Sequence, residues 1–276
     1  MLLKFTKMHG LGNDFMVIDG VTQNVRLSPE KIRELGDRHF GIGFDQLLLV
    51  EPPDCPDMDF RYRIFNTDGN EVEQCGNGAR CFARFVRDRK LSFGRRIKVQ
   101  TAKGNIELHV GLDDQISVNM GAPELEPYDI PFKADRQSIT YKLEVDGRIE
   151  EISVISMGNP HAVVMVDDCK HAPVAQLGSK IQNHFRFPEK CNVGFMEIVN
   201  PAVINLRVFE RGVGETLACG SGACAAVVAG RLQGLLERTV TVNLSGGALE
   251  ITWQGDNKPV WMKGPATRVY EGQIRV

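Results

Sequence analysis

The stretches Cys75-Gly76-Asn77-Gly78-Ala79 and Cys219-Gly220-Ser221-Gly222-Ala223 decide how this chain folds. They lie 144 residues apart (219 − 75), and the same offset aligns Arg63-Ile64-Phe65-Asn66 with Arg207-Val208-Phe209-Glu210 without a gap. A constant offset through long motifs indicates an internal repeat. The sequence therefore predicts two diverged copies of one unit.

Motifs outside this block align at nearly the same offset. They pair Gly12-Asn13 with Gly158-Asn159, Gln46 with Asn192, and residues 104–108 with residues 247–251. We predict a first domain of residues 1–120 plus 265–276, in which the last strand returns to the first copy. Residues 121–264 form the predicted second domain.

Each copy is predicted to consist mainly of short strands. Alternating apolar residues and turn residues between the segments favour an antiparallel, hairpin-rich sheet. The predicted strands are residues 59–66, 96–101, 106–110 and 115–120 in the first copy, residues 143–151, 162–167, 203–209, 239–244 and 249–253 in the second, and the returning strand 267–276.

Four segments carry helix signals. Ser28-Pro29 is a predicted helix start, and residues 173–184 have a similar pattern. Residues 79–86 and 223–232, which follow the two Cys-Gly stretches, are apolar or small on most sides, and such helices belong inside a protein. The predicted fold class is therefore α+β, with two pseudo-symmetric domains, each an antiparallel sheet or barrel wrapped around a central helix.

The composition is that of an ordinary globular chain. Of 276 residues, 42% are hydrophobic and 25% charged, which argues against disorder and collagen-like repeats. A net charge of −2 offers no field for a polyanion, so nucleic acid is not an expected partner. The apolar runs are too short to span a bilayer, and the polar first residues differ from a secretory signal, so we expect no membrane segment and a cytoplasmic protein.

Cys75 and Cys219 are each followed at once by a predicted helix. The first N–H groups of a helix lack intrahelical partners and, with the macrodipole, favour an anion, which lowers the pKa of a thiol placed there. The adjoining glycines let a substrate carboxylate approach the same N–H groups. Because the copies are equivalent, we expect the two thiols to face each other across a substrate carbon.

Two acids of one type on opposite faces of a carbon suit one reaction. One thiolate removes a proton from one face and the opposite thiol delivers a proton to the other, which inverts the centre. Like-charge repulsion would hold the pair to roughly one proton between them. The pattern therefore indicates a racemase or epimerase.

Other uses of the cysteines remain open. Cys81 and Cys224 stand at spacings that a metal pair could use, but no Cys-x2-Cys occurs and both lie in apolar helices, so no metal site is expected. A disulfide between Cys75 and Cys219 is possible but disfavoured in a reducing compartment. A phosphate-binding loop would need a Gly-Lys-Ser/Thr ending, which neither copy has.

Several longer motifs resemble those of the diaminopimelate epimerase family. They are Lys7-Met8-His9-Gly10-Leu11-Gly12-Asn13-Asp14-Phe15, Gly43-Phe44-Asp45-Gln46, Phe65-Asn66, Gln74-Cys75-Gly76-Asn77-Gly78-Ala79-Arg80-Cys81, Met157-Gly158-Asn159-Pro160-His161, Asn192-Val193-Gly194-Phe195, and Glu210-Arg211-Gly212 with Ala218-Cys219-Gly220-Ser221-Gly222. The resemblance spans nearly the whole chain. It implies a homodimeric enzyme, without pyridoxal phosphate or metal, that interconverts LL- and meso-2,6-diaminoheptanedioate for lysine and peptidoglycan precursor synthesis.

The resemblance also implies roles for individual residues. Cys75 resembles the proton donor and Cys219 the proton acceptor for one direction, and His161 and Glu210 resemble an accessory catalytic pair. The implied substrate contacts are Asn13, Gln46, Asn66, Gly76, Asn77, Asn159, Asn192, Glu210, Arg211, Gly220 and Ser221. A substrate with two ammonium and two carboxylate groups needs donors and acceptors, which amides supply, and Arg211 alone can fork onto the distal carboxylate.

Two competing functions use the same cysteines. A proline racemase or hydroxyproline epimerase would leave Arg211 and the surplus amides without a purpose, because an imino acid has no second charged end. A thiol redox sensor would join the two cysteines in a reversible disulfide. Assays with both substrates, and with peroxide, discriminate among the three.

Overall fold

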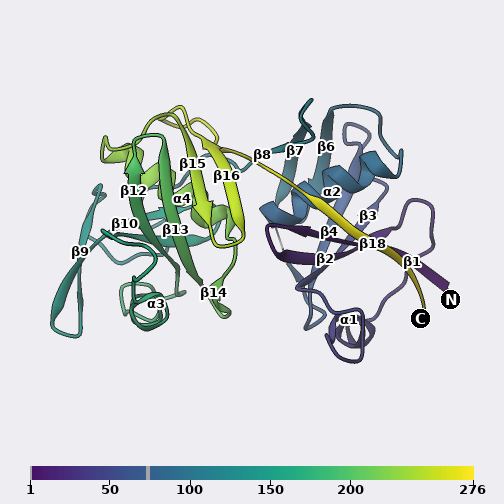
Figure 1. The fold of residues 1–276 in the computed structure, drawn as a ribbon, viewed down its shortest axis with the longest axis horizontal. Helices are drawn as coiled ribbons and strands as arrows, with labels where there is room; N and C mark the ends of the chain where they lie inside the picture. The colour runs from purple at the N-terminus through teal and green to yellow at the C-terminus, as the bar shows by residue number, and fades with distance from the viewer. Residues whose placement is uncertain (1, 73–74) are drawn as a thin grey trace. The chain divides into compact units, whose positions relative to one another are not determined.

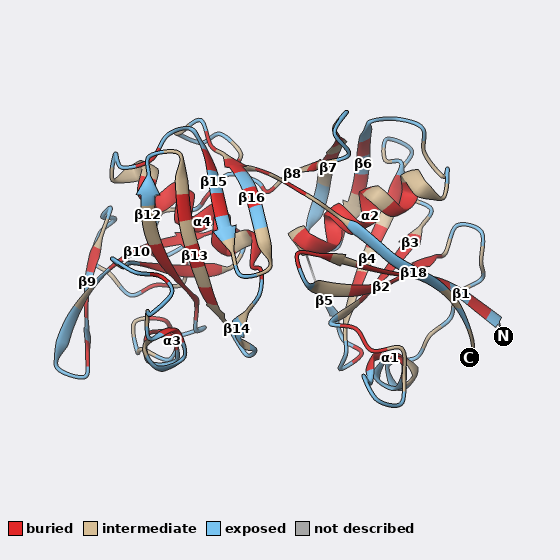
Figure 2. Cartoon of the chain, viewed as in Figure 1, coloured by how far each residue is buried: buried red, intermediate tan, exposed pale blue. Residues whose placement is uncertain are grey.

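Each Cys-Gly stretch opens a helix that is buried along most of its length. The computed structural model describes residues 2–72 and 75–276, and in it α2 spans Gly76–Asp88 and α4 spans Gly220–Leu232. Nearly all residues from Asn77 to Val86 and from Gly222 to Gly230 are buried (Figure 2). Both predicted central helices are thus confirmed, and they begin directly after the cysteines.

The chain divides into two units. Unit 1 comprises Met1–Asn119 with Lys263–Val276, and unit 2 comprises Met120–Met262. β18 (Thr267–Arg275) pairs with β1 (Leu2–Gly10), which adds the end of the chain to unit 1 (Figure 1).

The strands of unit 1 form one continuous series around α2. From edge to edge the pairing runs β18, β1, β2 (Asn13–Asp19), β3 (Gln46–Glu51), β4 (Phe60–Asn66), β6 (Arg96–Thr101), β7 (Gly104–Val110) and β8 (Ile116–Asn119), with β5 (Glu71–Val72) on β4. β17 (Trp261–Gly264) pairs with β8, and the boundary between the units falls within it. α2 packs against strands from both halves of this series, including β1, β2, β7 and β8.

Unit 2 repeats the same order of strands. The series runs β9 (Tyr141–Val145), β10 (Arg148–Ser156), β11 (Pro160–Met165), β12 (Asn192–Asn200), β13 (Val203–Glu210), β15 (Thr239–Leu244) and β16 (Gly247–Thr252), with β14 (Gly214–Thr216) on β13. α4 packs against β10 to β13 and β16 (Figure 1). The predicted segment 143–151 is a hairpin that turns at Asp146-Gly147.

The sheets are not purely antiparallel, which corrects one detail of the prediction. β2 pairs with β3, β4 with β6, β11 with β12, and β13 with β15 in parallel. Parallel neighbours need a long crossover connection, usually with a helix. Each of the four helices in the described residues lies in one such crossover: α1 (Pro29–Gly36), α2, α3 (Val174–Gln182) and α4.

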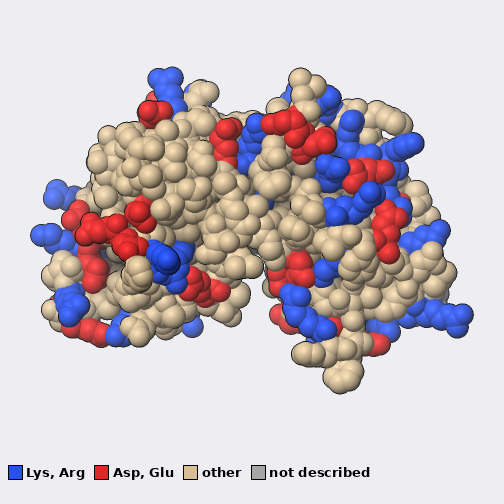
Figure 3. All heavy atoms as spheres, in the orientation of Figure 1, with Lys and Arg blue, Asp and Glu red and all other residues tan. Residues whose placement is uncertain are grey.

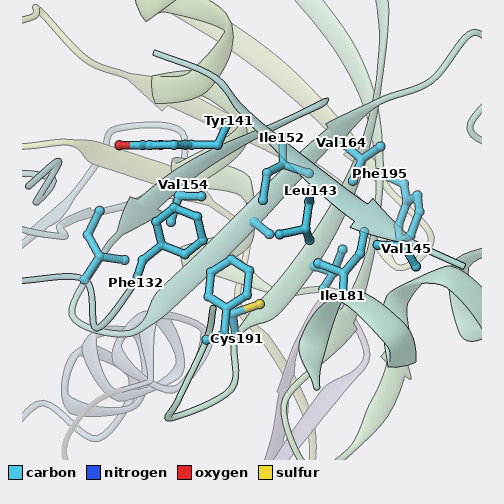
Figure 4. Close-up of a cluster of buried hydrophobic side chains, with 14 of the residues drawn as sticks. Phe132, Tyr141, Leu143, Val145, Ile152, Val154, Val164, Ile181, Cys191 and Phe195 are labelled. Atoms are coloured by element: carbon cyan, nitrogen blue, oxygen red, sulfur yellow. The ribbon is translucent and has the colours of Figure 1, made fainter. Parts of the chain in front are cut away.

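Apolar clusters also cover the face of each sheet that turns away from its central helix. In unit 1, Ile32 and Leu35 of α1 pack with Met16 and Leu47. In unit 2, α3 contributes Ile181 to a larger cluster around Leu143, Ile152 and Phe195 (Figure 4). Strands buried on both faces lack alternation, which is why β2, β3 and β12 escaped the sequence prediction.

Local signals at the surface agree with the sequence. Ser28 Oγ accepts a hydrogen bond from the Lys31 N–H, which confirms the predicted cap of α1. Lys and Arg side chains are interspersed with Asp and Glu over the faces shown in Figure 3. None of the described helices is both long and apolar enough to cross a membrane.

Candidate active site

In unit 1 the predicted amides gather at one end of three neighbouring strands. β2 begins at Asn13, β3 begins at Gln46, and β4 ends at Asn66, directly opposite Gln46. Gln46 Nε2 donates to Asn66 Oδ1 at 2.9 Å. The start of α2 lies at the same end, because Cys75 Sγ donates to Asn13 Oδ1 at 3.6 Å.

Cys75 is the N-cap of α2. Its sulfur accepts the Gly78 N–H at 3.4 Å, so the cysteine partners one of the unpaired N–H groups of the first turn. Gly76 and Asn77 follow in that turn, and the Asn77 side chain, which is almost fully buried, donates to Asn13 Oδ1 at 3.3 Å. Gln74, part of the same motif, lies outside the described residues.

Unit 2 places its predicted residues in the equivalent way. His161, near the start of β11, pairs in register with Asn192 at the start of β12, and β13 ends at Glu210. His161 Nε2 lies 3.1 Å from Asn159 Oδ1, and the Arg211 N–H donates to Asn192 Oδ1 at 2.8 Å. Both units therefore hold their candidate residues at the strand ends beside a central helix.

Cys219 caps α4 as Cys75 caps α2. Its sulfur accepts the Gly222 N–H at 3.4 Å and lies 3.6 Å from Ser221 Oγ. Burial raises the pKa of the Cys219 thiol well above its usual value, and the Glu210 carboxylate raises it further, against the opposing hydrogen bonds from Ser221 and Gly222. A lowered pKa, as predicted from the helix terminus alone, is therefore wrong for Cys219.

His161 and Arg211 differ from the expectation drawn from the sequence. Complete burial, with the Arg211 charge nearby, lowers the pKa of His161 to about 3, so the imidazole is neutral. Since Asn159 Oδ1 only accepts hydrogen bonds, Nε2 carries the imidazole proton and Nδ1 is the acceptor. Arg211 itself is exposed and donates to the Glu189 carbonyl at 2.9 Å, so it is not the buried fork that a distal carboxylate site suggests.

The sequence analysis missed three side chains that hold these residues by hydrogen bonds, two of them charged. Asp45 accepts from Asn13, Arg80 donates to Asn77, and Thr216 donates to Glu210. Asp45 and Arg80 each lie within one of the motifs that resemble the family, and this position was the sequence signal that could have identified them. Among the residues described, no three His, Cys, Asp or Glu side chains are grouped to hold a metal ion.

Solved structures share this fold across nearly the whole chain. A hydroxyproline epimerase from Agrobacterium vitis matches with a TM-score of 0.71 and 12% identity, over 99% of this chain and 92% of that chain. A phenazine biosynthesis protein of the PhzF family from Bacillus anthracis matches with a TM-score of 0.69 and 16% identity over 100% of both chains. The fold is therefore the two-unit architecture that these proteins have in common.

The comparison of sequences is more specific than the comparison of folds. The family model for diaminopimelate epimerase matches residues 5–126 and 153–269. Diaminopimelate epimerases from Pseudomonas entomophila (strain L48) and Azotobacter vinelandii (strain DJ) are each 59% identical over 276 residues, which is 100% of both chains. The chain belongs to the diaminopimelate epimerase family.

Gly78, in the first turn of α2, is predicted to tolerate no larger side chain. A Cβ at Gly78 would lie 2.3 Å from the Tyr62 hydroxyl, on a ring packed against Phe82. We expect Gly78→Ala to destabilise the protein by about 1–3 kcal/mol through overpacking, measured by urea unfolding. Tyr62→Phe removes the clashing atom, so the double variant should recover most of the loss.

The matched control is Gly222→Ala, where the nearest atom would be 3.1 Å away and the cost should be smaller. The Tyr62 hydroxyl is buried with no hydrogen-bond partner among the described residues, so Tyr62→Phe alone should cost little. No recovery in the double variant would mean that another contact limits Gly78.

The buried imidazole predicts a pH dependence of stability. A histidine whose folded pKa is about 3 binds a proton more weakly than in the unfolded chain, so stability is lost as pH falls below about 6.5. Between pH 7.5 and pH 5 this group should lower the free energy of unfolding by about 2 kcal/mol. Urea titrations of His161→Gln should lack that decrease, whereas the exposed control His171→Gln should keep it; equal slopes in all three proteins would rule out a buried neutral His161.

Proposed function

We propose that this chain interconverts LL- and meso-2,6-diaminoheptanedioate, with Cys75 and Cys219 acting on opposite faces of one α-carbon. The supporting observation is that both cysteines are N-caps of repeat-equivalent helices, with each sulfur 3.4 Å from a first-turn N–H. One sulfur takes the α-proton as a thiolate, the other gives its S–H proton to the opposite face, and the two exchange roles in the reverse direction.

The helix starts would also hold the reacting carboxylate. First-turn N–H groups of Gly76, Asn77, Gly220 and Ser221 lie beside the two sulfurs, where N–H groups of a helix favour an anion. Removal of the α-proton turns the carboxylate into an enediolate with more negative charge. Donors fixed in advance stabilise that charge without reorganising, and each is typically worth about 2.7–4 kcal/mol.

His161 and Glu210 would manage charge on the Cys219 side. The neutral imidazole presents Nδ1 as an acceptor, and Glu210 is held by Thr216 Oγ1 while it acts electrostatically on the Cys219 thiol. Both groups can therefore accept hydrogen bonds from the substrate ammonium. A cation there would offset the negative charge that opposes ionisation of Cys219.

The amides would recognise the rest of the substrate. Asn13, Gln46 and Asn66 lie at the strand ends of unit 1, and Asn159 and Asn192 lie at those of unit 2. The exposed Arg211 guanidinium is available to the distal carboxylate once it leaves the Glu189 carbonyl. A redox-sensor function is less well supported, because the raised pKa of Cys219 disfavours the reactive thiolate that peroxide needs.

The proposed reaction needs neither pyridoxal phosphate nor metal, since thiols and backbone donors supply every step. It would take place in the cytoplasm, where a chain with seven cysteines keeps its thiols reduced. The products would serve lysine and peptidoglycan precursor synthesis.

Solvent deuterium tests the two-thiol reaction. Starting from the LL isomer in heavy water, early product should carry deuterium at the inverted carbon while recovered substrate remains protonated, because the removed proton stays on its own sulfur. Mass spectrometry and NMR of the separated isomers measure this. Cys75→Ala and Cys219→Ala should each abolish inversion in a folded protein, and a chelator should have no effect; equal early deuterium in substrate and product would contradict two bases.

The homodimer has a test of its own. Seven of the nine residues of β18 are exposed, including Val269 at 55%, although a strand normally buries one face. A second copy of the chain on this strand would cover them. Light scattering should give twice 30.7 kDa, and Val269→Asp should shift the mass toward one chain, whereas the control Phe93→Asp should not; one chain in the unmodified protein would refute the dimer.

A further inference from the structure

A chain of hydrogen bonds in unit 1 runs from a buried cation to a carboxylate past Cys75. Arg80 Nη2 donates to Asn77 Oδ1 at 2.9 Å, Asn77 Nδ2 donates to Asn13 Oδ1 at 3.3 Å, and Asn13 Nδ2 donates to Asp45 Oδ2 at 2.9 Å. Cys75 donates its S–H to the same Asn13 Oδ1. The thiol is therefore attached to the middle of the chain.

The two ends fix the direction of every bond between them. A guanidinium can only donate and an ionised carboxylate can only accept, whereas each amide offers an oxygen at one end and an NH2 group at the other. Asp45 therefore requires the NH2 group of Asn13, and Arg80 requires the oxygen of Asn77. Only one arrangement satisfies both ends, and it turns the Asn13 oxygen toward the Cys75 sulfur.

Each end is itself held firmly. Arg80 is fully buried on α2 and also donates to the Pro265 carbonyl at 3.1 Å. Asp45 accepts from Arg38 at 2.7 Å and from the Asp14 N–H at 3.0 Å. Arg38 also forks onto the Asp14 carboxylate, whose pKa is lowered to about 2 despite burial.

The second copy has no such ends. The repeat equivalents of Asp45 and Arg80 are Cys191 and Cys224, and both are buried thiols. The bonds from Gly78 and Gly222 to the two sulfurs are alike, so they do not distinguish the thiols. The chain from Arg80 to Asp45 is thus a feature of Cys75 alone.

We propose that Asp45 and Arg80 are positioning residues that keep Cys75 in its protonated form in the substrate-free enzyme, by holding the Asn13 oxygen rather than its NH2 group against the sulfur. The proposal rests on the proposed function, since it says which thiol enters the reaction as the proton donor. A hydrogen bond to an amide oxygen exists only for the S–H form, so it favours the thiol over the thiolate.

Among the described residues, two titratable groups that interact with Cys75 do not supply this effect. Tyr62 on β4 and Cys81 on α2 both interact electrostatically with Cys75. Burial raises the pKa of each well above neutrality, so both are uncharged in the working range. Arg80 is the cation beside Cys81, and a cation alone would favour the thiolate.

Alkylation of the resting enzyme tests the proposal. Iodoacetamide reacts with the thiolate, so its rate at Cys75, followed by peptide mass spectrometry between pH 6 and pH 9, reports the thiolate fraction. Asp45→Asn removes the acceptor that requires the Asn13 NH2 group, so only the 3.3 Å bond from Asn77 still holds the Asn13 oxygen, and the amide turns its NH2 group toward the sulfur more often. We expect alkylation of Cys75 at neutral pH to rise about 3- to 10-fold, the worth of one hydrogen bond, with the rate at Cys219 unchanged.

Two further variants distinguish rotation of the Asn13 amide from the loss of one negative charge near Cys75. Asp54→Asn removes one negative charge from an exposed ion pair with Arg61 and should leave the rate at Cys75 unchanged. In an Asn13→Ala background no amide can turn, so adding Asp45→Asn should have no further effect. An equal effect in that background would assign the result to charge and overturn the proposal, as would no effect of Asp45→Asn in the unmodified chain.

The alkylation assay still tests the proposal if Asp45→Asn does not fold or if the protein does not epimerise diaminopimelate. Asp45→Ala, which removes the acceptor entirely, should change the rate in the same direction and replaces Asp45→Asn if circular dichroism shows that variant unfolded. Alkylation needs no turnover, so it tests the thiol even if the protein fails to epimerise diaminopimelate. Failure of the proposed function would appear in the deuterium experiment, and failure of this proposal in the alkylation rates.

Discussion

The hydrogen bond from a first-turn N–H to a cysteine sulfur is the interaction on which both units depend. A helix that starts inside a protein must partner N–H groups that have no carbonyl within the helix. Sulfur is a weak acceptor that partners one N–H in each unit, from Gly78 or Gly222. The remaining first-turn groups favour an anion. A fold that encloses α2 and α4 in strands therefore places a cysteine sulfur beside N–H groups that favour an anion in each unit.

The two copies share one backbone arrangement, and residues that differ between equivalent positions give the two cysteines different surroundings. The register places Phe15 opposite Gln46 in unit 1 and His161 opposite Asn192 in unit 2, so a core aromatic in one copy is an imidazole in the other. Further departures exchange Asn66 for Glu210, Asp45 for Cys191, and Arg80 for Cys224. Two thiols in identical surroundings would have equal affinities for a proton. These substitutions give each thiol a different set of neighbours.

Local patterns predicted the repeat, the central helices and the hairpins, because each leaves its mark within a few residues. They could not predict β2 and β3, whose burial on both faces removes alternation, or the parallel pairs, which depend on crossovers between distant segments. The pKa of Cys219 also escaped prediction, because it depends on burial and on Glu210 from another strand. Asp45 and Arg80 look like ordinary surface charges until their partners are known.

The surroundings of Cys219 imply that its ionisation is coupled to the substrate in the proposed reaction. Burial and the Glu210 carboxylate both disfavour the Cys219 thiolate, and the neutral His161 carries no positive charge that could compensate. A substrate ammonium placed beside Glu210 would neutralise the carboxylate and bring its own positive charge close to the sulfur. The site would then generate its base only when the α-carbon to be deprotonated is present. In the proposed reaction, a strongly raised pKa of Cys219 is thus compatible with catalysis, because the ammonium group that would lower it arrives with the substrate.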